Sequence, residues 1–160
     1  MILAERLYEL VVQQRALVMG VGNPLCGDDA VGSVVAARLA QRFAERAVDA
    51  GPVPESFLGP LLATAGRPVM FVDAVAHGGA PGSCCLVRTG DLVARDPSTH
   101  RASLELLGEL LDGEGVPTWV LGIQPLQLEV GAPLSRDVAR TADELTQLLT
   151  AALAAGCVDA

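Results

Sequence analysis

ALVMGVGNPLCGDDAVGSVVAA, residues 16–37, is the stretch that decides the fold. An apolar run from Ala16 to Met19 leads into two glycines and an Asn-Pro pair, and then Asp28 and Asp29 open an apolar-periodic segment. Short apolar runs bounded by glycine are typical of buried strands, and acids before helical periodicity are typical of helix N-termini. The stretch therefore predicts a strand, a tight loop and a helix, with carboxylates at the strand's carboxyl end, where open α/β proteins bind their ligands.

The same pattern returns later in the chain. A second apolar run, PVMFV at residues 68–72, ends in Asp73, and further strands are expected at 47–50, 83–88 and 118–123. The loop before residue 83 is too short for a parallel crossover, so that strand is expected to be antiparallel. Amphipathic segments alternate with the strands, which predicts a three-layer α/β/α sandwich on a mixed, mostly parallel sheet.

The length of 160 residues fits one domain. We expect a helical extension at residues 1–15, packed on the outside or on a second copy, then a single α/β/α domain at 16–155 and a tail at 156–160. The N-terminus lacks a basic region and an unbroken apolar core, and no apolar run approaches the roughly 20 residues of a membrane span. We therefore expect a cytoplasmic protein with no membrane partner.

Charge argues against a nucleic-acid partner. The net charge is −8, and the 11 basic residues are scattered rather than gathered into a stripe.

Several sequence motifs of common enzyme classes are missing. The third glycine of a dinucleotide fingerprint would fall at Leu25, and there is neither a P-loop lysine motif nor a GxSxG elbow.

The four cysteines form no CxxC motif. Cys84 and Cys85 would point to opposite faces of a strand, which does not favour chelation. We interpret these two and Cys157 as small buried apolar residues. Cys26 lies in the loop of the organising stretch, where it could lie near a ligand.

Carboxylates and histidine remain as candidates for chemistry. For Asp28 we favour a structural role at the helix N-terminus, whereas Asp29 could point over the sheet edge toward Asp73. His77 is followed by two glycines and is interpreted as an ordinary surface residue. His100 lies just before a helix at the same edge of the sheet and is the better ligand candidate. Two carboxylates and one imidazole would suit a metal such as zinc or nickel whose other ligands come from elsewhere.

Four motifs in this order and spacing resemble the endopeptidases that mature the large subunit of nickel–iron hydrogenases. They are GVGNPLCGDDAVG at 20–32, FVDAVAHGGAPG at 71–82, STHRASLELL at 98–107 and LGIQPLQLEVGAPLS at 121–135. The resemblance runs from about residue 16 to residue 154. It implies an α/β/α fold of the phosphorylase/hydrolase type with a five-stranded mixed sheet, and removal of a short C-terminal peptide from the hydrogenase large-subunit precursor after nickel insertion.

The resemblance also implies the site. The acid after the GN loop, the aspartate at the end of the central strand and the downstream histidine correspond to Asp29, Asp73 and His100, as metal-contacting and catalytic residues. They would reach nickel already held by the precursor, so no tightly bound metal is expected in the isolated protein. Either a carboxylate or a water activated at the metal would serve the hydrolysis. A cleft formed in part by Leu25, Cys26 and the loop after Asp73 would receive the substrate's tail.

Two other classes of function stay open at this point. One is a chaperone or nickel-checking module that binds the precursor without cutting it. The other is an α/β hydrolase or phosphorylase-like enzyme for a small molecule, against which the shortage of basic and aromatic residues argues.

Overall fold

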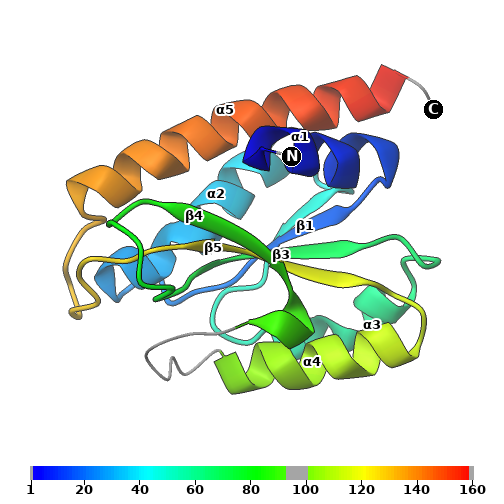
Figure 1. Cartoon of the computed structure of the whole chain (residues 1–160), viewed down its shortest axis with the longest axis horizontal. Coiled ribbons are helices and arrows are strands. Elements are labelled where there is room, and N and C mark those ends of the chain that lie inside the picture. The colour runs from blue at the N-terminus through cyan, green and yellow to red at the C-terminus, as the bar shows by residue number, and fades with distance from the viewer. Residues whose placement is uncertain (1, 93–100, 159–160) are drawn as a thin grey trace.

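The central sheet has the strand order β2-β1-β3-β5-β4 (Figure 1). The computed structural model describes residues 2–92 and 101–158. The strands are β1 Leu17–Gly20, β2 Ala47–Asp49, β3 Val69–Ala74, β4 Cys84–Arg88 and β5 Thr118–Ile123. β4 pairs with β5 antiparallel and the other pairs are parallel, as the short loop before residue 83 predicted.

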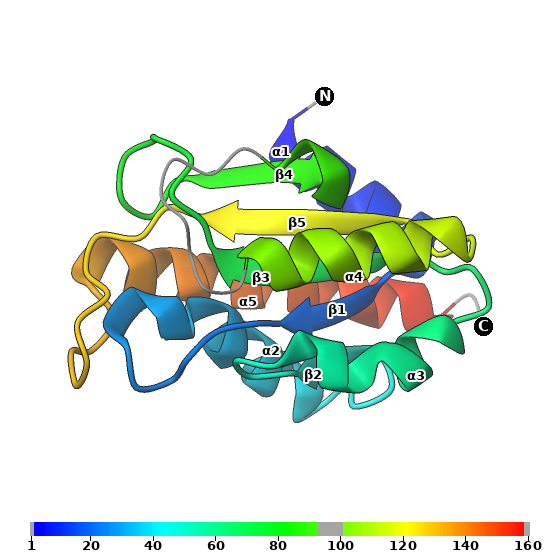
Figure 2. The same ribbon diagram turned by 90° about the horizontal axis from the view of Figure 1, so that it is seen from below.

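Helices cover both faces of the sheet (Figure 2). The α-helices are α1 Leu3–Tyr8, α2 Val31–Ala40, α3 Leu58–Leu62, α4 Arg101–Gly113 and α5 Arg136–Val158. Shorter helices are the π-helix η1 Glu9–Gln13 and the 3-10 helices η2 Gly27–Ala30, η3 Pro54–Phe57 and η4 Thr89–Asp91. The predicted three-layer α/β/α sandwich on a five-stranded, mostly parallel sheet is confirmed.

Each face of the sheet has its own apolar core. On one face, α1, η1, α2 and α5 bury residues such as Leu7, Val35 and Leu149 against the sheet. On the other face, α3 and α4 bury Leu61 and Leu104. Sheet residues alternate between the two cores because successive strand side chains point to opposite faces. Both cores are built almost wholly from aliphatic residues.

The N-terminal segment packs on its own chain. Leu7, Leu10 and Val11 are buried beside α5 in the same core as the sheet. Arg46 adds polar contacts, since its guanidinium donates to the carbonyl oxygens of Val11 at 2.7 Å and Ala16 at 3.2 Å. Residues 3–13 are thus helical, as expected, and contribute side chains to the main core.

Several boundaries differ from those expected. β3 continues through Asp73 to Ala74, because its pairing with β5 continues to the end of that strand. α5 extends to Val158, past residue 155. Cys157 is exposed, and Cys84 and Cys85 are only half-buried, which corrects the interpretation that all three are buried. None of the helices in residues 2–92 and 101–158 is long and apolar enough to cross a bilayer.

Candidate active site

The site begins where β1 and β3 end side by side. The N–H of Val21 donates to the carbonyl of Val72 at 2.9 Å, which continues the pairing of the two strands beyond β1. Helix α2 starts directly over this point. A Cβ on Gly32 would lie 1.9 Å from the carbonyl oxygen of Val72 and 2.4 Å from that of Val21. Only glycine allows this approach, so Gly32 sets the start of α2 against the carboxyl ends of the two strands.

Asp29 lies in η2, the turn that joins β1 to α2. Its side chain is half-buried, and one carboxylate oxygen accepts a hydrogen bond from the N–H of Asn23 at 3.1 Å. Gly22 makes this tight turn possible. It has a φ of 151°, and a Cβ there would lie 1.9 Å from the carbonyl oxygen of Asp29. The GxGN sequence therefore fixes the backbone that carries this carboxylate.

Asp73 lies in β3, the central strand, and is only 1% exposed. One carboxylate oxygen accepts a hydrogen bond from the N–H of Ala74 at 2.8 Å. Burial raises the pKa of Asp73 well above its usual range, and the negative charge of Asp29 raises it further, while the Ala74 hydrogen bond acts in the opposite direction. The structure thus brings together two of the three sequence-predicted site residues.

Of the histidines, His100 lies outside the described residues, and α4 begins at the next position. The ring of His77 lies 3.1 Å from the carbonyl oxygen of Ser83 and 3.5 Å from its hydroxyl, so it closes the loop between β3 and β4. This agrees with an ordinary role for His77. No group of three His, Cys, Asp or Glu side chains that could hold a metal occurs within residues 2–92 and 101–158. The two carboxylates alone are an incomplete ligand set.

Asp28 has a structural role, but it does not cap its own helix. It is fully buried, and its carboxylate accepts hydrogen bonds from the N–H groups of Leu126, Gln127 and Ser135 and from the Ser135 hydroxyl, at 2.6–3.0 Å. Burial would raise the pKa of Asp28, but these hydrogen bonds outweigh it and hold that pKa below its ordinary value. Sequence reasoning missed this link, because local patterns do not reveal a partner so distant in the chain.

A family model described as HycI, hydrogenase maturation protease, matches residues 34–152, which is more than half of the chain. The chain belongs to the hydrogenase maturation protease family. Asp73 and position 100 fall inside the matched range, and Asp29 falls just before it. The resemblance found in the sequence motifs is therefore confirmed for the family.

Solved structures agree with the family assignment. The HycI [NiFe] hydrogenase maturation protease of Thermococcus kodakarensis is 27% identical, with a TM-score of 0.82, covering 93% of this chain and 99% of that chain. The hydrogenase maturating endopeptidase HybD of Escherichia coli is also 27% identical, with a TM-score of 0.71, covering 87% and 91%. A Methanocaldococcus jannaschii protein assigned to the hydrogenase maturation proteases is 27% identical over 150 residues, 85% of this chain and 86% of that protein.

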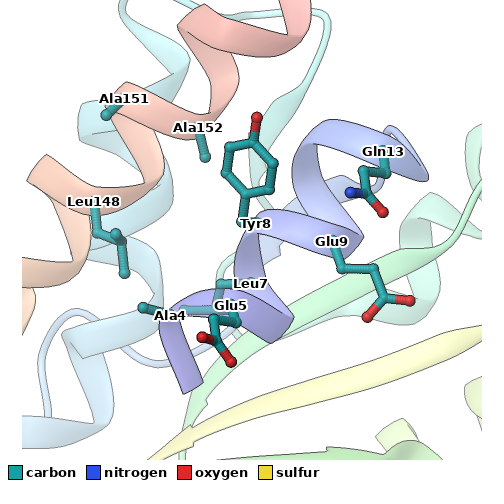
Figure 3. Close-up of a pocket in the computed structure, with 9 residues that line it drawn as sticks. All are labelled: Ala4, Glu5, Leu7, Tyr8, Glu9, Gln13, Leu148, Ala151 and Ala152. Atoms are coloured by element: carbon teal, nitrogen blue, oxygen red, sulfur yellow. The ribbon is translucent and has the colours of Figure 1, made fainter. Parts of the chain in front are cut away.

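The maturation protease has a separate hollow between its N-terminal helix and α5 (Figure 3). Its volume is about 770 Å³, and its walls are mainly apolar. The lining residues are Ala4, Glu5, Leu7, Tyr8, Glu9, Gln13, Leu148, Ala151 and Ala152. None of the candidate site residues lines it. The hollow is therefore separate from the candidate site at the carboxylates of β3 and η2.

Proposed function

We propose that this protease removes a short C-terminal peptide from the large-subunit precursor of a [NiFe] hydrogenase. The observation that carries the proposal is the pair of carboxylates, Asp29 and Asp73, at the carboxyl edge of the sheet, where burial raises the pKa of Asp73 and the negative charge of Asp29 raises it further. Relatives of the same fold are called a [NiFe] hydrogenase maturation protease and a hydrogenase maturating endopeptidase. Two such carboxyl groups can supply the proton transfers that amide hydrolysis needs.

Nickel belongs to the substrate in this proposal. The precursor brings the ion on its own cysteine thiolates, and Asp29, Asp73 and His100 provide oxygen and nitrogen ligands for positions that the precursor leaves open. Carboxylate and imidazole groups suit a divalent metal of borderline softness. Two or three such ligands without thiolates form a weak site, so the isolated protease is expected to bind nickel weakly or not at all.

The two carboxyl groups take different parts in the proposed hydrolysis. Burial favours the protonated form of Asp73 in the free protein, and that proton leaves when the carboxylate binds the precursor's nickel. Asp29, in a half-buried turn, accepts the proton of the attacking water and passes it to the leaving amide nitrogen. Alternatively, the substrate's nickel activates the attacking water. In either case the water loses one proton and the leaving amide nitrogen gains one.

The direct test is mass spectrometry of the hydrogenase large-subunit precursor from the same organism, nickel-loaded and nickel-free, after incubation with the protease. We expect the nickel-loaded precursor to lose a C-terminal peptide, and Asp29→Asn, Asp73→Asn and His100→Ala to abolish that loss. Asp143→Asn is a matched control, because that acid lies on the surface of α5 in an ion pair with Arg38. Cleavage that survives Asp29→Asn would contradict the assigned site.

The same experiment separates the enzyme from a binding module. A precursor that stays intact but forms a stable complex with the wild-type chain would favour a nickel-checking or chaperone function. The nickel content of the precursor has to be verified by metal analysis in both the nickel-loaded and the nickel-free samples.

A further inference from the structure

The hollow between the N-terminal helix and α5 combines apolar walls with two acidic side chains. Its volume of about 770 Å³ lies within the range of about 300–1,000 Å³ that is usual for binding pockets. Figure 3 shows Tyr8 and Leu148 projecting into the space between the two helices. Tyr8 is 50% exposed and Leu148 is 38% exposed. The hollow therefore leaves apolar surface in water that burial against a partner would stabilise.

Small side chains make room in the hollow. Ala151 and Ala152 line it from α5, and Ala4 lines it from α1. Leu148, Ala151 and Ala152 have the spacing i, i+3 and i+4, so they lie on one face of α5. Packed helices approach to about 8–10 Å between their axes, and the approach is closest where the contacting side chains are small. This face of α5 can accept another helix at close range.

The helical walls decide the form of the occupant. They belong to α1, η1 and α5, whose backbone N–H and C=O groups are largely bonded within the helices, so the lining residues provide no strand edge for an extended peptide. An α-helix satisfies its own backbone groups and needs only side chains to fill an apolar space. In addition, η1 is a π-helix, a form found frequently at functional sites. The hollow thus fits a third helix packed against two others.

Two carboxylates decide the charge of the occupant. The charged side chains that line the hollow are Glu5 and Glu9. The Glu5 carboxylate accepts a hydrogen bond from the N–H of Ile2 at 3.1 Å, and the Glu9 carboxylate accepts one from the side-chain amide of Gln14 at 3.3 Å. Both donors are neutral, so neither bond cancels the negative charge. Lysine or arginine on the flanks of a docked helix would complement both acids.

The same acids argue against a second copy of this chain as the occupant. Two hollows that faced each other across a two-fold axis would bring Glu5 and Glu9 of one copy close to the same residues of the other. Such like-charge contacts disfavour association. Arg6, the cation beside Glu5 in the sequence, lies over the ring of Trp119 at 5.0 Å from its centroid. It is therefore already engaged within its own chain.

We propose that the hollow binds an amphipathic helix of a second protein, with apolar side chains at i, i+3, i+4 and i+7 facing the hollow and basic side chains on its flanks. Leu148 lies about 20 Å along α5 from Ser135, at 1.5 Å per residue, and Ser135 is the residue that bonds to Asp28. The hollow is thus a docking surface apart from the carboxylate pair. The proposal does not rest on the proposed function, because neither Asp29 nor Asp73 lines the hollow.

The first test uses two designed helical peptides of about 18 residues with the same leucine and alanine face. One peptide carries lysine on both flanks of that face, and the other carries glutamate there. Fluorescence anisotropy measures the binding of each peptide to the full chain. We expect the lysine peptide to bind at least about tenfold more tightly at roughly 50 mM salt. The preference should shrink at roughly 500 mM salt, because salt screens exposed charges.

A substitution inside the hollow tests whether the peptide binds there. Ala151→Arg adds a large cation to the exposed lining of the hollow. Gln147→Arg is the matched control, because it places the same charge on an exposed position of α5 outside the lining. We expect Ala151→Arg to raise the Kd of the lysine peptide more than about tenfold, and Gln147→Arg to change it less than about threefold. Circular dichroism verifies that both variants are folded.

A charge-neutralising variant tests the role of the acids. Glu5→Gln/Glu9→Gln removes both charges and keeps an oxygen acceptor for the hydrogen bonds of each side chain. Glu109→Gln/Glu114→Gln makes the same change of charge in and beside α4, on the other face of the sheet (Figure 2). We expect the first variant to bind the two peptides with nearly equal affinity, and the control to keep the preference for lysine.

Photo-cross-linking in the native cells identifies the natural occupant. Ala151 is replaced by the photoreactive amino acid p-benzoylphenylalanine, and the cross-linked segment is sequenced by mass spectrometry. We expect a helix of another protein with an apolar face and basic flanks, and we expect Glu5→Gln/Glu9→Gln to reduce the cross-link. The proposal is overturned by equal affinity of the two peptides for the wild-type chain or by unchanged binding to Ala151→Arg. Cross-links only to a second copy, to a lipid or to no protein also overturn it.

Discussion

Burial in the central strand raises the pKa of Asp73, and the negative charge of Asp29 raises that pKa further. The two residues come from different elements, and they meet because β1 and β3 end together and the turn after β1 folds back over their ends. The native fold therefore favours a proton on Asp73 that the unfolded chain would hold less tightly. A cation at this site would relieve the repulsion between the two carboxylates.

Asp73→Asn is expected to stabilise the free protein while abolishing cleavage. A raised pKa means that Asp73 contributes stability below its ordinary value of 3.8, and that this stability is lost as the pH rises through the native-state pKa. The neutral amide avoids that loss, so we expect a gain of about 0.5–2 kcal/mol in the free energy of unfolding near neutral pH. The gain should disappear near pH 3, as measured by urea unfolding. A loss of stability at pH 7 would contradict this account.

Gly32→Ala is expected to destabilise the fold and to reduce cleavage together. The added methyl group would meet the carbonyl of Val72 and push α2 away from the sheet, which carries Asp29 away from Asp73. Overpacking of this kind costs about 1–3 kcal/mol. Gly59→Ala is the matched control, since nothing lies within 4 Å of its Cβ and it lies in α3. Thermal unfolding should show the control unchanged or slightly more stable.

Asp28→Ala is expected to be among the more damaging single substitutions. It removes the acceptor from the backbone N–H groups of Leu126, Gln127 and Ser135. Each buried donor left without a partner costs about 1–3 kcal/mol, and the N–H and hydroxyl of Ser135 are such donors, whereas the bonds of Leu126 and Gln127 are only partly buried, so the total loss should be about 2–4 kcal/mol. Because the pKa of Asp28 is lowered, its contribution is present above pH 3.8 and is lost as the pH falls through the native-state value. Urea unfolding at pH 7 and pH 2.5 should show a smaller difference from wild type at the lower pH.

Leu7→Ala tests whether the N-terminal segment is part of the domain core. Leu7 is 1% exposed, so the substitution should lower the free energy of unfolding by about 2–4 kcal/mol. Ile2→Ala, in the same segment but 65% exposed, should change it by less than about 0.5 kcal/mol. A negligible effect of Leu7→Ala would support an independent extension at residues 1–15.

Local periodicity was enough to predict most of the architecture. The apolar runs at residues 16–21 and 118–123 gave β1 and β5, and the short connection before residue 83 gave the antiparallel orientation of β4. The end of β3 was misjudged, because a charged residue normally marks the end of a buried strand. Asp73 is instead held inside the strand by pairing with β5 opposite Gly122.

The site was predictable only in part. Asp29 and Asp73 follow two neighbouring apolar runs, so their meeting at one sheet edge follows from parallel strand order. The partners of Asp28 could not be predicted, because no local pattern links it to Ser135 across most of the chain. The predicted roles of Asp29, Asp73 and His100 remain predictions, and His100 lies outside the described residues.

Asp28 anchors the loop between β5 and α5 near its start, at Leu126 and Gln127, and at its last residue, Ser135, and the N–H of Gly131 donates to the carbonyl of Leu25 in between. A loop attached in this way can exchange its outward side chains while its path and the hydrolytic machinery stay the same. Related proteases could then change which precursor they bind without changing the residues that carry out the hydrolysis. A chimaera that carries residues 124–134 of a paralogous protease, with Asp28 and Ser135 retained, would inherit the client of the donor.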